Sequence, residues 1–540
     1  MNGRRERLYH LLVLIFATAL FTFRLGAGSF WDVDEPRYAE AGREAAVTGE
    51  WLTPHLNGAP WLGPAPLWIW LEAASGRVFG FSEWPARAWS AAFGVAGVGA
   101  VSALGREWFG PRTGLLSGLV LTTMLAYAVT ARLAVVDLAA VAWMLLAAWA
   151  GYRAYRAPDA CGRRRAYLLA SIFLGLGVLT RGPGTAVVPA ATMVAFLGYR
   201  RSLGRLREMP WAAAVVIFLA IAAPWYAVET ARFGTGFLRD AVWGHAAARA
   251  ATPPAADAGL LLTDAGIVAI GAVPWTAFLP AAAGYHYFQR WQDGSLLCLL
   301  WSAFVVLLAA TVGDGLPGDV LALFPIAAIA VARLWEEFLF EGAGRLGRLL
   351  WTSFALQIGV VVLVVMAAAW FATSRYPREF AAVRDFLLAP VGALVLGTGV
   401  ATVLFRLRRY PAAFLSLPAT TAVFLGILYT GTLPAVETQK PMGPLAAHLR
   451  AELRPGDRVI AYLVPSPAAL VFYARHYVEP AGDPAALVRL ICAPGRAFVV
   501  GRRDDLAAAD RLPGGLRTVA ADGAYVVDEK PEAVACRQAP

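Results

Sequence analysis

Long apolar runs, separated by short polar stretches rich in arginine, dominate the pattern along the chain. Thirteen runs of 16 to 23 residues occur, which is close to the length that a helix needs to cross a bilayer. They cover residues 8–26, 86–105, 112–131, 134–155, 166–181, 182–199, 210–231, 261–283, 295–312, 316–334, 349–371, 386–405 and 412–432. The pattern predicts an α-helical polytopic membrane protein with about 13 transmembrane helices.

Residues 27–85 do not have the pattern of a membrane span. They form a loop after the first run, with helix-like stretches near 35–50 and 66–79. The second stretch is rich in tryptophan, and we expect it to lie in the membrane interface. Glu72 and Arg77 would then lie on its wet face.

Residues 433–540 have a soluble composition. Arg458–Val464 and Arg496–Gly501 are typical of buried strands, and residues 468–475, 484–492 and 504–511 are typical of helices. This alternation predicts a small C-terminal α/β domain, beside a transmembrane domain over residues 1–432.

The arginines indicate the topology. If the N-terminus, with Arg4, Arg5 and Arg7, is cytoplasmic, then the arginine clusters of 106–112, 153–165, 200–207, 333–348 and 406–409 also fall in cytoplasmic loops, as the positive-inside rule requires. An odd number of spans places residues 433–540 outside. We expect a multi-pass protein of a bacterial inner membrane. Its first run is long for a signal peptide and lacks a clear cleavage site, so we expect it to remain as a span.

Composition narrows the class further. The chain is 59% hydrophobic and 16% charged, with mean hydropathy +0.57, whereas a soluble domain has about a quarter charged residues. These values exclude a soluble enzyme, a secreted disulfide scaffold and a disordered protein. The net charge of +10 does not indicate nucleic-acid binding, because the arginines cluster between the apolar runs. The four cysteines show neither metal-ligand spacing nor a disulfide framework.

Several ionisable residues lie at the predicted outer membrane border, where burial of a charge is costly and therefore indicates function. They lie in four places: the loop after the first apolar run, the start of the fourth run, the turn after the fifth run and the loop after the seventh run. They are Asp34 and Glu35, Asp137, Arg181, and His245 with Arg249. Together they suit a reaction between an acceptor group and an anionic lipid headgroup.

Each of these residues also has a purely structural interpretation. Asp34 and Glu35 would stabilise the start of a helix. Asp137 would pair with Arg132 at a helix start, and Arg181 would anchor a helix at the interface. His245 and Arg249 would be ordinary polar residues of a loop. The tryptophan-rich stretch favours membrane packing over sugar binding.

Short motifs spread over most of the chain resemble glycosyltransferase family 39, and the first 110 residues carry the most specific ones. The motifs are Asp34-Glu35-Pro36-Arg37-Tyr38-Ala39-Glu40, residues 49–58 (GEWLTPHLNG), Arg87, Phe109-Gly110, Arg132 to Asp137, residues 176–183 (LGVLTRGP), Pro224-Trp225-Tyr226 and Trp243-Gly244-His245. This family includes protein O-mannosyltransferases. The chain resembles most its bacterial branch of 4-amino-4-deoxy-L-arabinose lipid A transferases.

The resemblance implies a GT-C fold and an enzyme that takes a sugar from a polyprenyl-phosphate carrier. The acceptor would be a lipid, a glycan or a protein at the outer face. Asp34 and Asp137 would be the catalytic carboxylates, and Arg37, Arg132, Arg181 and Arg249 would bind the donor phosphate. Glu35, His55 and His245 would belong to the acceptor loops. A divalent metal is compatible with the family, but no ligand set follows from the sequence.

The chain departs from the family pattern at two places. Where the family has an acid and a lysine in the first loop, this chain has Gly63 and Pro64, and Asp314-Gly315-Leu316-Pro317 lacks a second family lysine. These losses leave open a non-catalytic protein that binds a lipid carrier in envelope assembly. A transporter is a weaker alternative, because the sequence shows no inverted repeat and its acids lie at one face rather than at the midplane.

Overall fold

The chain folds into two compact units. The computed structural model describes residues 3–31, 33–239, 241, 254–312, 317–341, 344–375, 377–438, 440–509 and 516–531. The first unit, here called the helical unit, comprises Met1–Leu25, Leu62–Trp68 and Arg87–Thr432. The second, the mixed unit, comprises Gly26–Trp61, Ile69–Ala86 and Leu433–Pro540. Most of the first polar loop therefore belongs with the C-terminal segment.

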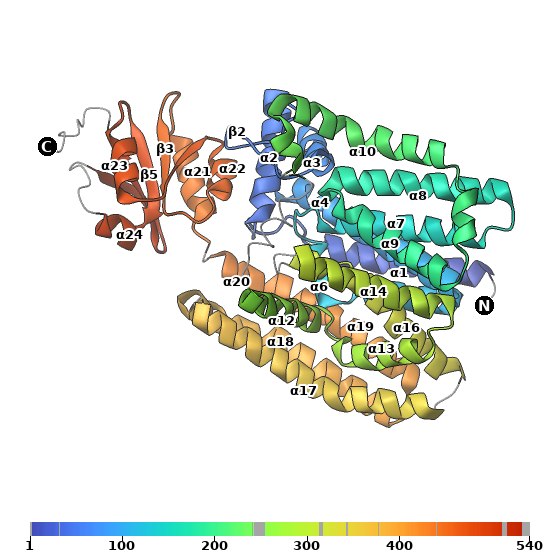
Figure 1. The fold of residues 1–540 in the computed structure, drawn as a ribbon. Helices are drawn as coiled ribbons and strands as arrows, with labels where there is room; N and C mark the ends of the chain where they lie inside the picture. The colour runs from blue at the N-terminus through green and yellow to red at the C-terminus, as the bar shows by residue number, and fades with distance from the viewer. Residues whose placement is uncertain are drawn as a thin grey trace. The chain divides into compact units, whose positions relative to one another are not determined.

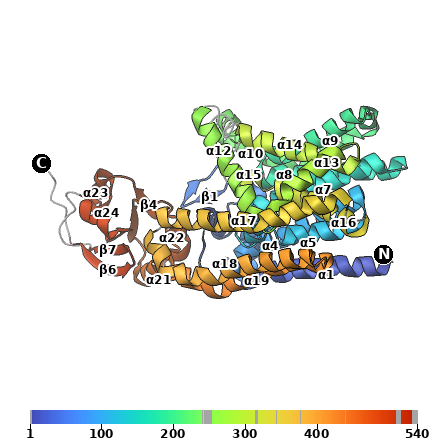
Figure 2. The same ribbon diagram turned by 90° about the horizontal axis from the view of Figure 1, so that it is seen from below.

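Helices occur at all thirteen apolar runs of the sequence. They are α1 (Gly3–Thr22), α4 (Glu83–Phe109), α5 (Pro111–Thr122), α6 (Leu125–Thr130), α7 (Asp137–Arg156), α8 (Ala160–Arg181), α9 (Gly184–Tyr199), α10 (Trp211–Phe233), α12 (Pro254–Gly271), η2 (Thr276–Phe278), α13 (Leu279–Phe288), α14 (Asp293–Val312), α15 (Pro317–Val320), α16 (Leu323–Glu341), α17 (Gly344–Arg375), α18 (Pro377–Arg406), α19 (Tyr410–Ile427) and η3 (Leu428–Thr432). The short helix η1 (Leu203–Glu208) lies between two of the runs. In both ribbon views α18 and α19 lie side by side (Figures 1 and 2).

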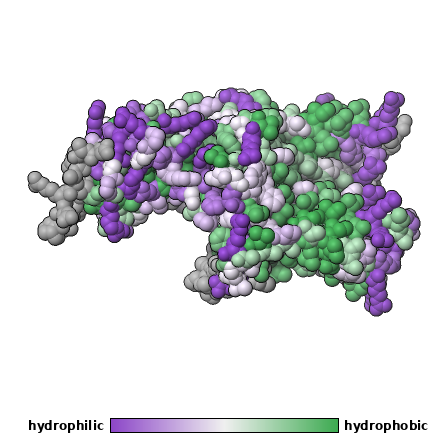
Figure 3. Space-filling model, turned by 90° about the horizontal axis from the view of Figure 1, so that it is seen from above, coloured by the Kyte–Doolittle hydropathy of each residue, from purple (hydrophilic) through white to green (hydrophobic). Residues whose placement is uncertain are grey.

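Six helices of the described chain are long and apolar enough to cross a membrane, and a bent pair would make a seventh. The six are Glu83–Phe109, Trp211–Phe233, Asp293–Thr311, Leu346–Leu363, Phe386–Arg406 and Tyr410–Glu437. On the face of the helical unit that Figure 3 shows, hydrophobic residues predominate, and hydrophilic ones gather at the end of the helices where the N-terminus lies (Figures 1 and 3). The chain is therefore a multi-pass membrane protein, and the count of thirteen spans stays a prediction.

Three of the expected spans are broken rather than continuous. Residues 112–131 form α5 and α6, residues 316–334 form α15 and α16, and residues 261–283 bend by 111° between α12 and the helices that follow. Pro274 lies in this bend, where it supplies no backbone N–H for a continuous helix. The break before α6 and this bend meet, because the backbone N–H of Leu125 donates to the carbonyl of Val273 at 3.1 Å.

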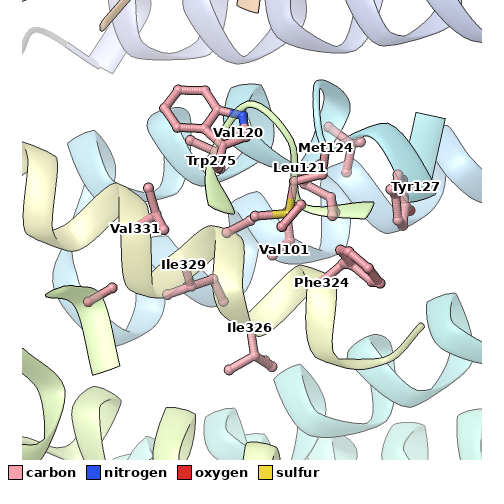
Figure 4. Packing of buried hydrophobic residues seen from close by; sticks show 14 of the residues in the cluster. Val101, Val120, Leu121, Met124, Tyr127, Trp275, Phe324, Ile326, Ile329 and Val331 are labelled. Atoms are coloured by element: carbon pink, nitrogen blue, oxygen red, sulfur yellow. The ribbon is translucent and has the colours of Figure 1, made fainter. Parts of the chain in front are cut away.

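A buried aromatic and aliphatic cluster joins the broken helices to their neighbours. Trp275, fully buried at the bend, packs on Phe414 with ring centroids 5.3 Å apart and donates from Nε1 to Thr123 Oγ1 at 3.1 Å. Figure 4 shows Trp275 near Leu121 and Val120, with Phe324 and further aliphatic side chains in the same cluster. This packing stabilises the breaks through contacts between distant helices.

The mixed unit is built around a five-stranded sheet in the order β4-β3-β5-β7-β6. Its strands β3, β4 and β5 are parallel, and β7 and β6 are antiparallel. The elements are α20 (Leu433–Glu437), α21 (Met442–Glu452), β3 (Arg458–Tyr462), α22 (Ala468–Ala474), β4 (Val478–Ala481), α23 (Pro484–Cys492), β5 (Ala497–Arg502), α24 (Arg503–Ala508), β6 (Arg517–Asp522) and β7 (Tyr525–Lys530).

Both faces of the sheet are covered by helices, as continuous apolar strands require. Val459 packs with α21 and α22, whereas its neighbour Ile460 packs with α23 and α24. The strands and helices that the sequence predicts in this segment coincide with β3, β5, α22, α23 and α24. One expectation was wrong, because Cys492 is disulfide-bonded. Spacing along the chain does not reveal a pairing that depends on the tertiary fold.

The first polar loop contributes two helices and a hairpin to the fold. The helices are α2 (Asp34–Thr48) and α3 (Pro66–Phe79), and the strands are β1 (His55–Leu56) and β2 (Ala59–Pro60). The two helices approach closely, since a Cβ on Gly42 would lie 2.5 Å from the Cβ of Glu72. Both helices lie where the sequence predicts them.

Candidate functional site

The helical unit brings Asp137 and Arg181 together. Asp137 is the first residue of α7 and Arg181 is the last residue of α8. The two helices are joined by a short loop and pack against each other (Figure 1), so these residues lie at the same end of the pair. Arg181 Nη1 is 2.5 Å from Asp137 Oδ1, and the two side chains are 33% and 19% exposed.

Gly318, in α15, contacts the Asp137–Arg181 pair from a third helix. Arg181 Nη1 donates to the carbonyl oxygen of Gly318 in α15 at 3.0 Å. A Cβ atom at this position would overlap Asp137 Oδ1 and lie 2.8 Å from Arg181 Nη2. A larger residue here would therefore require the side chains of Asp137 and Arg181 to move. The accessible part of Arg181 offers guanidinium N–H groups that suit a phosphate.

Arg132 has a different environment from the one that the sequence predicts. It is 4% exposed, and its guanidinium donates to the carbonyl oxygens of Leu20 at 2.8 Å, Phe21 at 3.1 Å and Phe23. Its Cζ atom also lies 3.6 Å from the ring centroid of Tyr429. Leu20 and Phe21 are in the last turn of α1 and Phe23 follows it, and the last carbonyls of a helix generally lack partners within the helix. The geometry therefore favours a structural role for Arg132 over phosphate binding.

In the mixed unit, Asp34 begins α2 and is accessible. Its side chain is 47% exposed and Oδ1 lies 3.4 Å from Nη1 of Arg37, one turn later. An acid in the first turn of a helix is stabilised by the helix dipole, and the exposed carboxylate can still meet a ligand. Both interpretations of Asp34 from the sequence therefore stand.

Glu35 and Glu72 are both buried, which the sequence did not predict for Glu72. Glu35 is fully buried and its Oε2 accepts from the backbone N–H of Trp31 at 2.7 Å. Glu72 is 4% exposed instead of facing water, because α3 packs against α2 at Gly42. Burial, and secondarily the charge of Glu35, raises the pKa of Glu72 well above its usual value.

His55 lies in the short hairpin of the same loop. Its Nδ1 is 2.9 Å from the carbonyl oxygen of Thr53, so Nδ1 donates and a neutral ring keeps Nε2 as an acceptor. Asn57 and Gly58 form the turn with φ of 57° and 76°, which is typical of a two-residue hairpin. Asn57 also pairs with the backbone of Val478 at 2.6 and 2.8 Å, which attaches the hairpin to β4.

Lys440 is a residue that the sequence reasoning missed. Its Nζ donates to the carbonyl oxygens of Ser29 at 3.1 Å and Phe30 at 3.4 Å, and it lies 3.9 Å from the ring centroid of Trp31. These residues come just before Asp34. The sequence did carry a sign of this residue, because Lys440 is one of only two lysines among 47 basic residues.

His245 and Arg249, the remaining predicted site residues, lie outside the described residues. Among those that are described, no three side chains of the metal-ligand types come together. The described residues therefore do not fit a metal centre built from three protein ligands.

Comparison with known structures identifies the class of fold. The chain superposes on the crystal structure of ArnT from Cupriavidus metallidurans bound to undecaprenyl phosphate with a TM-score of 0.81, at 21% identity over 98% of this chain and 99% of that one. The apo structure of the same protein gives 0.78 at 20% identity. The chain thus has the fold of a polytopic GT-C membrane glycosyltransferase.

Sequence comparisons give the particular relatives. The undecaprenyl phosphate-alpha-4-amino-4-deoxy-L-arabinose arabinosyl transferase of Erwinia tasmaniensis is 27% identical over 369 residues, which are 66% of this chain. The enzyme of the same name from an Enterobacter species is 26% identical over 370 residues. The chain spans 65% of the length of each of these relatives. The resemblance to the arabinose-transferase branch is confirmed.

A family model agrees with these relatives over part of the chain. Residues 63–227 match the model described as dolichyl-phosphate-mannose-protein mannosyltransferase. The matched stretch contains Arg132, Asp137 and Arg181 and begins after Asp34. The Asp137–Arg181 pair therefore lies within the matched region, whereas Gly318 lies outside it.

Proposed function

We propose that this chain is an integral membrane glycosyltransferase that moves a sugar from a polyprenyl-phosphate carrier to a lipid, glycan or protein acceptor. The observation that carries the proposal is the similarity to arabinosyl transferases over two thirds of the chain. The fold and the accessible acid and arginine at helix ends support it. The most direct candidate donor is the 4-amino-4-deoxy-L-arabinose carrier that the relatives' names give.

The transfer exchanges one bond at the anomeric carbon of the sugar for another. The bond to the carrier phosphate oxygen breaks, and the bond to the acceptor oxygen forms through an oxocarbenium-like state. Asp34 takes the proton of an acceptor hydroxyl, because it is the exposed carboxylate at the start of α2. The carrier leaves as a phosphate whose new negative charge needs a cation.

Arg181 supplies that cation in the helical unit. Its guanidinium is one third exposed and is oriented by Asp137 and by the carbonyl of Gly318. This orientation makes Asp137 a positioning residue for Arg181. Arg37 and Arg249 are the further candidates for the phosphate, and His55 and His245 for the acceptor.

We also propose thirteen spans, with the N-terminus in the cytoplasm of a bacterial cell and residues 433–540 outside its inner membrane. The arginine clusters support this topology through the positive-inside rule. The disulfide at Cys492 supports it independently, because such bonds persist in oxidising compartments. The reaction would then take place at the extracytoplasmic face.

The proposal can be tested with the purified full chain and a deletion strain. The purified protein is mixed with undecaprenyl-phosphate-linked sugars and an envelope fraction, and transfer of labelled sugar is measured. Mass spectrometry compares envelope lipids and glycans of the deletion strain with those of its parent. We expect transfer in vitro and a missing modification in the deletion strain. An unchanged profile together with no transfer would refute the enzymatic proposal.

A second candidate is a non-catalytic protein that binds the lipid carrier. It is favoured by Gly63 and Pro64, which stand where the family has an acid and a lysine. Binding of undecaprenyl phosphate without transfer of any sugar tested would favour this candidate.

A further inference from the structure

A cavity of about 610 Å³ lies at the other end of the α7–α8 pair from Asp137 and Arg181. It is lined by residues from the end of α4, the end of α7 and the start of α8, among them Glu107, Trp149, Arg153, Arg156, Arg165 and Leu169. A volume of this size is within the range of small-molecule sites, roughly 300–1,000 Å³.

The cavity belongs to the opposite side of the membrane from the candidate catalytic end. Helix α7 begins at Asp137 and ends with Arg156 after 20 residues, which at the rise of an α-helix is about 30 Å. That length matches the hydrocarbon core of a bilayer. The arginine pattern assigns the Arg156 end to the cytoplasm, so the cavity opens at the cytoplasmic leaflet.

The cavity carries surplus positive charge. Arg153 pairs with Glu107 at 3.5 Å, and its Cζ lies 5.0 Å from the ring centroid of Trp149. Asp159, the remaining acid of the lining, accepts from the N–H of Gly162 at the start of α8.

Two further guanidinium groups line the cavity, those of Arg156 and Arg165. Within the described part of the chain, Arg156 and Arg165 make no ion pair. Two guanidinium groups beside one cavity are the arrangement that binds a phosphate through several N–H groups.

One wall of the cavity is apolar and runs toward the membrane. Trp149 and Ala150 lie up to two turns before the end of α7, and Ala166 and Leu169 lie two to three turns into α8. Leu169 is 41% exposed. A free inorganic anion would make no favourable contact with this apolar wall, whereas the acyl chains of a lipid would cover it.

From this combination we propose that the cavity binds an anionic phospholipid of the cytoplasmic leaflet. The phosphate lies between Arg156 and Arg165, and an acyl chain follows Leu169. Basic pockets between transmembrane helices on the cytoplasmic side bind lipid headgroups in this manner. The site is separate from the proposed transfer reaction, and its assignment to the cytoplasmic leaflet rests on the proposed topology.

Native mass spectrometry of the full chain with phosphatidylglycerol tests the proposal. The double variant Arg156→Gln with Arg165→Gln removes the two unpaired charges. Each basic residue near a lipid surface changes affinity about fivefold, so the pair should weaken binding about 25-fold. The matched control, Arg164→Gln with Arg207→Gln, removes two exposed arginines of the same side that do not line the cavity, and it should bind like the wild type.

Two further measurements use the wild type, so that they do not depend on the folding of a variant, and they identify the ligand and its location. Phosphatidylethanolamine and inorganic phosphate should each bind at least tenfold more weakly than phosphatidylglycerol to the wild type. A photoreactive phosphatidylglycerol should crosslink to the wild-type peptide that spans residues 149–169. Equal affinity of the double variant and the wild type would overturn the proposal. Inorganic phosphate that binds as tightly as the lipid, or a crosslink elsewhere in the chain, would overturn it as well.

Discussion

Replacement of Asp34 by asparagine separates the catalytic interpretation of this residue from the structural one. Asn keeps the size of the side chain and much of its hydrogen bonding, but it cannot take a proton from an acceptor hydroxyl. The change removes one charge from the start of α2 and the contact with Arg37.

The two interpretations predict effects of very different size. The contact between Asp34 and Arg37 is 3.4 Å long between half-exposed groups, and such pairs contribute about 0.3–0.5 kcal/mol. The helix dipole adds about 0.3–1 kcal/mol for an acid in the first turn. The free energy of unfolding should therefore fall by only about 1 kcal/mol. Loss of a general base slows transfer by about 10²–10⁴, which is about 3–5 kcal/mol of activation free energy.

The assay measures initial rates of sugar transfer and thermal unfolding for the same preparations. Asp483→Asn is the matched control, because Asp483 is also an acid at a helix start in the mixed unit, where it accepts from the N–H of Ala486 at 2.7 Å. The control should leave the rate unchanged. If the acceptor is itself a phosphate, it needs no base and the loss should be smaller. A folded Asp34→Asn protein with an undiminished rate would refute the role of Asp34.

Four further outcomes follow from the described contacts. Lys440→Gln should lower the turnover number more than it changes KM, because the segment before α2 loses three contacts. Lys530→Gln is the control, and an equal loss of turnover number in both variants would contradict a positioning role for Lys440. Glu72 has a folded-state pKa above its unfolded value, so wild-type stability should fall as pH rises above about 4.5, by up to about 1.4 kcal/mol per pH unit. Glu72→Gln should make this slope shallower in thermal unfolding, while the contribution of Glu40, whose pKa burial raises to about 7, remains; parallel pH profiles of variant and wild type would refute the burial argument. Gly318→Ala should weaken donor binding at least tenfold because its Cβ overlaps Asp137. Gly284→Ala, whose Cβ would lie in open space, should not weaken donor binding. Titration with undecaprenyl phosphate measures the affinity of both variants. A reporter active only outside the cytoplasm should be active when fused after residue 540, and its silence there would mean that the span count is wrong by an odd number.

The membrane class and the positions of the helices were predictable because they depend on local properties. An apolar run of about 20 residues has one stable form in a bilayer, whatever its neighbours are. The strands Arg458–Tyr462 and Ala497–Arg502 were predictable for a similar reason, because each is a short continuous apolar run between turn residues.

The features that the sequence did not reveal depend on contacts between distant residues. At the bend near Val273 and the break before Leu125, the backbone N–H of Leu125 and the carbonyl of Val273 satisfy each other through one hydrogen bond. Glu72 is buried because Gly42 allows two helices to approach closely. Arg132 was predicted as a phosphate ligand from the family resemblance, but its guanidinium donates to carbonyl oxygens at the end of α1.

The environment of Arg132 changes how the other charges of the helical unit are interpreted. Four arginines were candidates for the donor phosphate, and for Arg132 the hydrogen bonds to the end of α1 favour a structural role. In the helical unit, Arg181 is the described candidate that combines exposure with a fixed orientation. That orientation depends on Asp137, whose Oδ1 contacts the guanidinium at 2.5 Å. A carboxylate held in this way is better suited to orient a cation than to accept a proton. The two acids that looked alike in the sequence therefore have different roles in our proposal, with Asp34 in proton transfer and Asp137 in the orientation of Arg181.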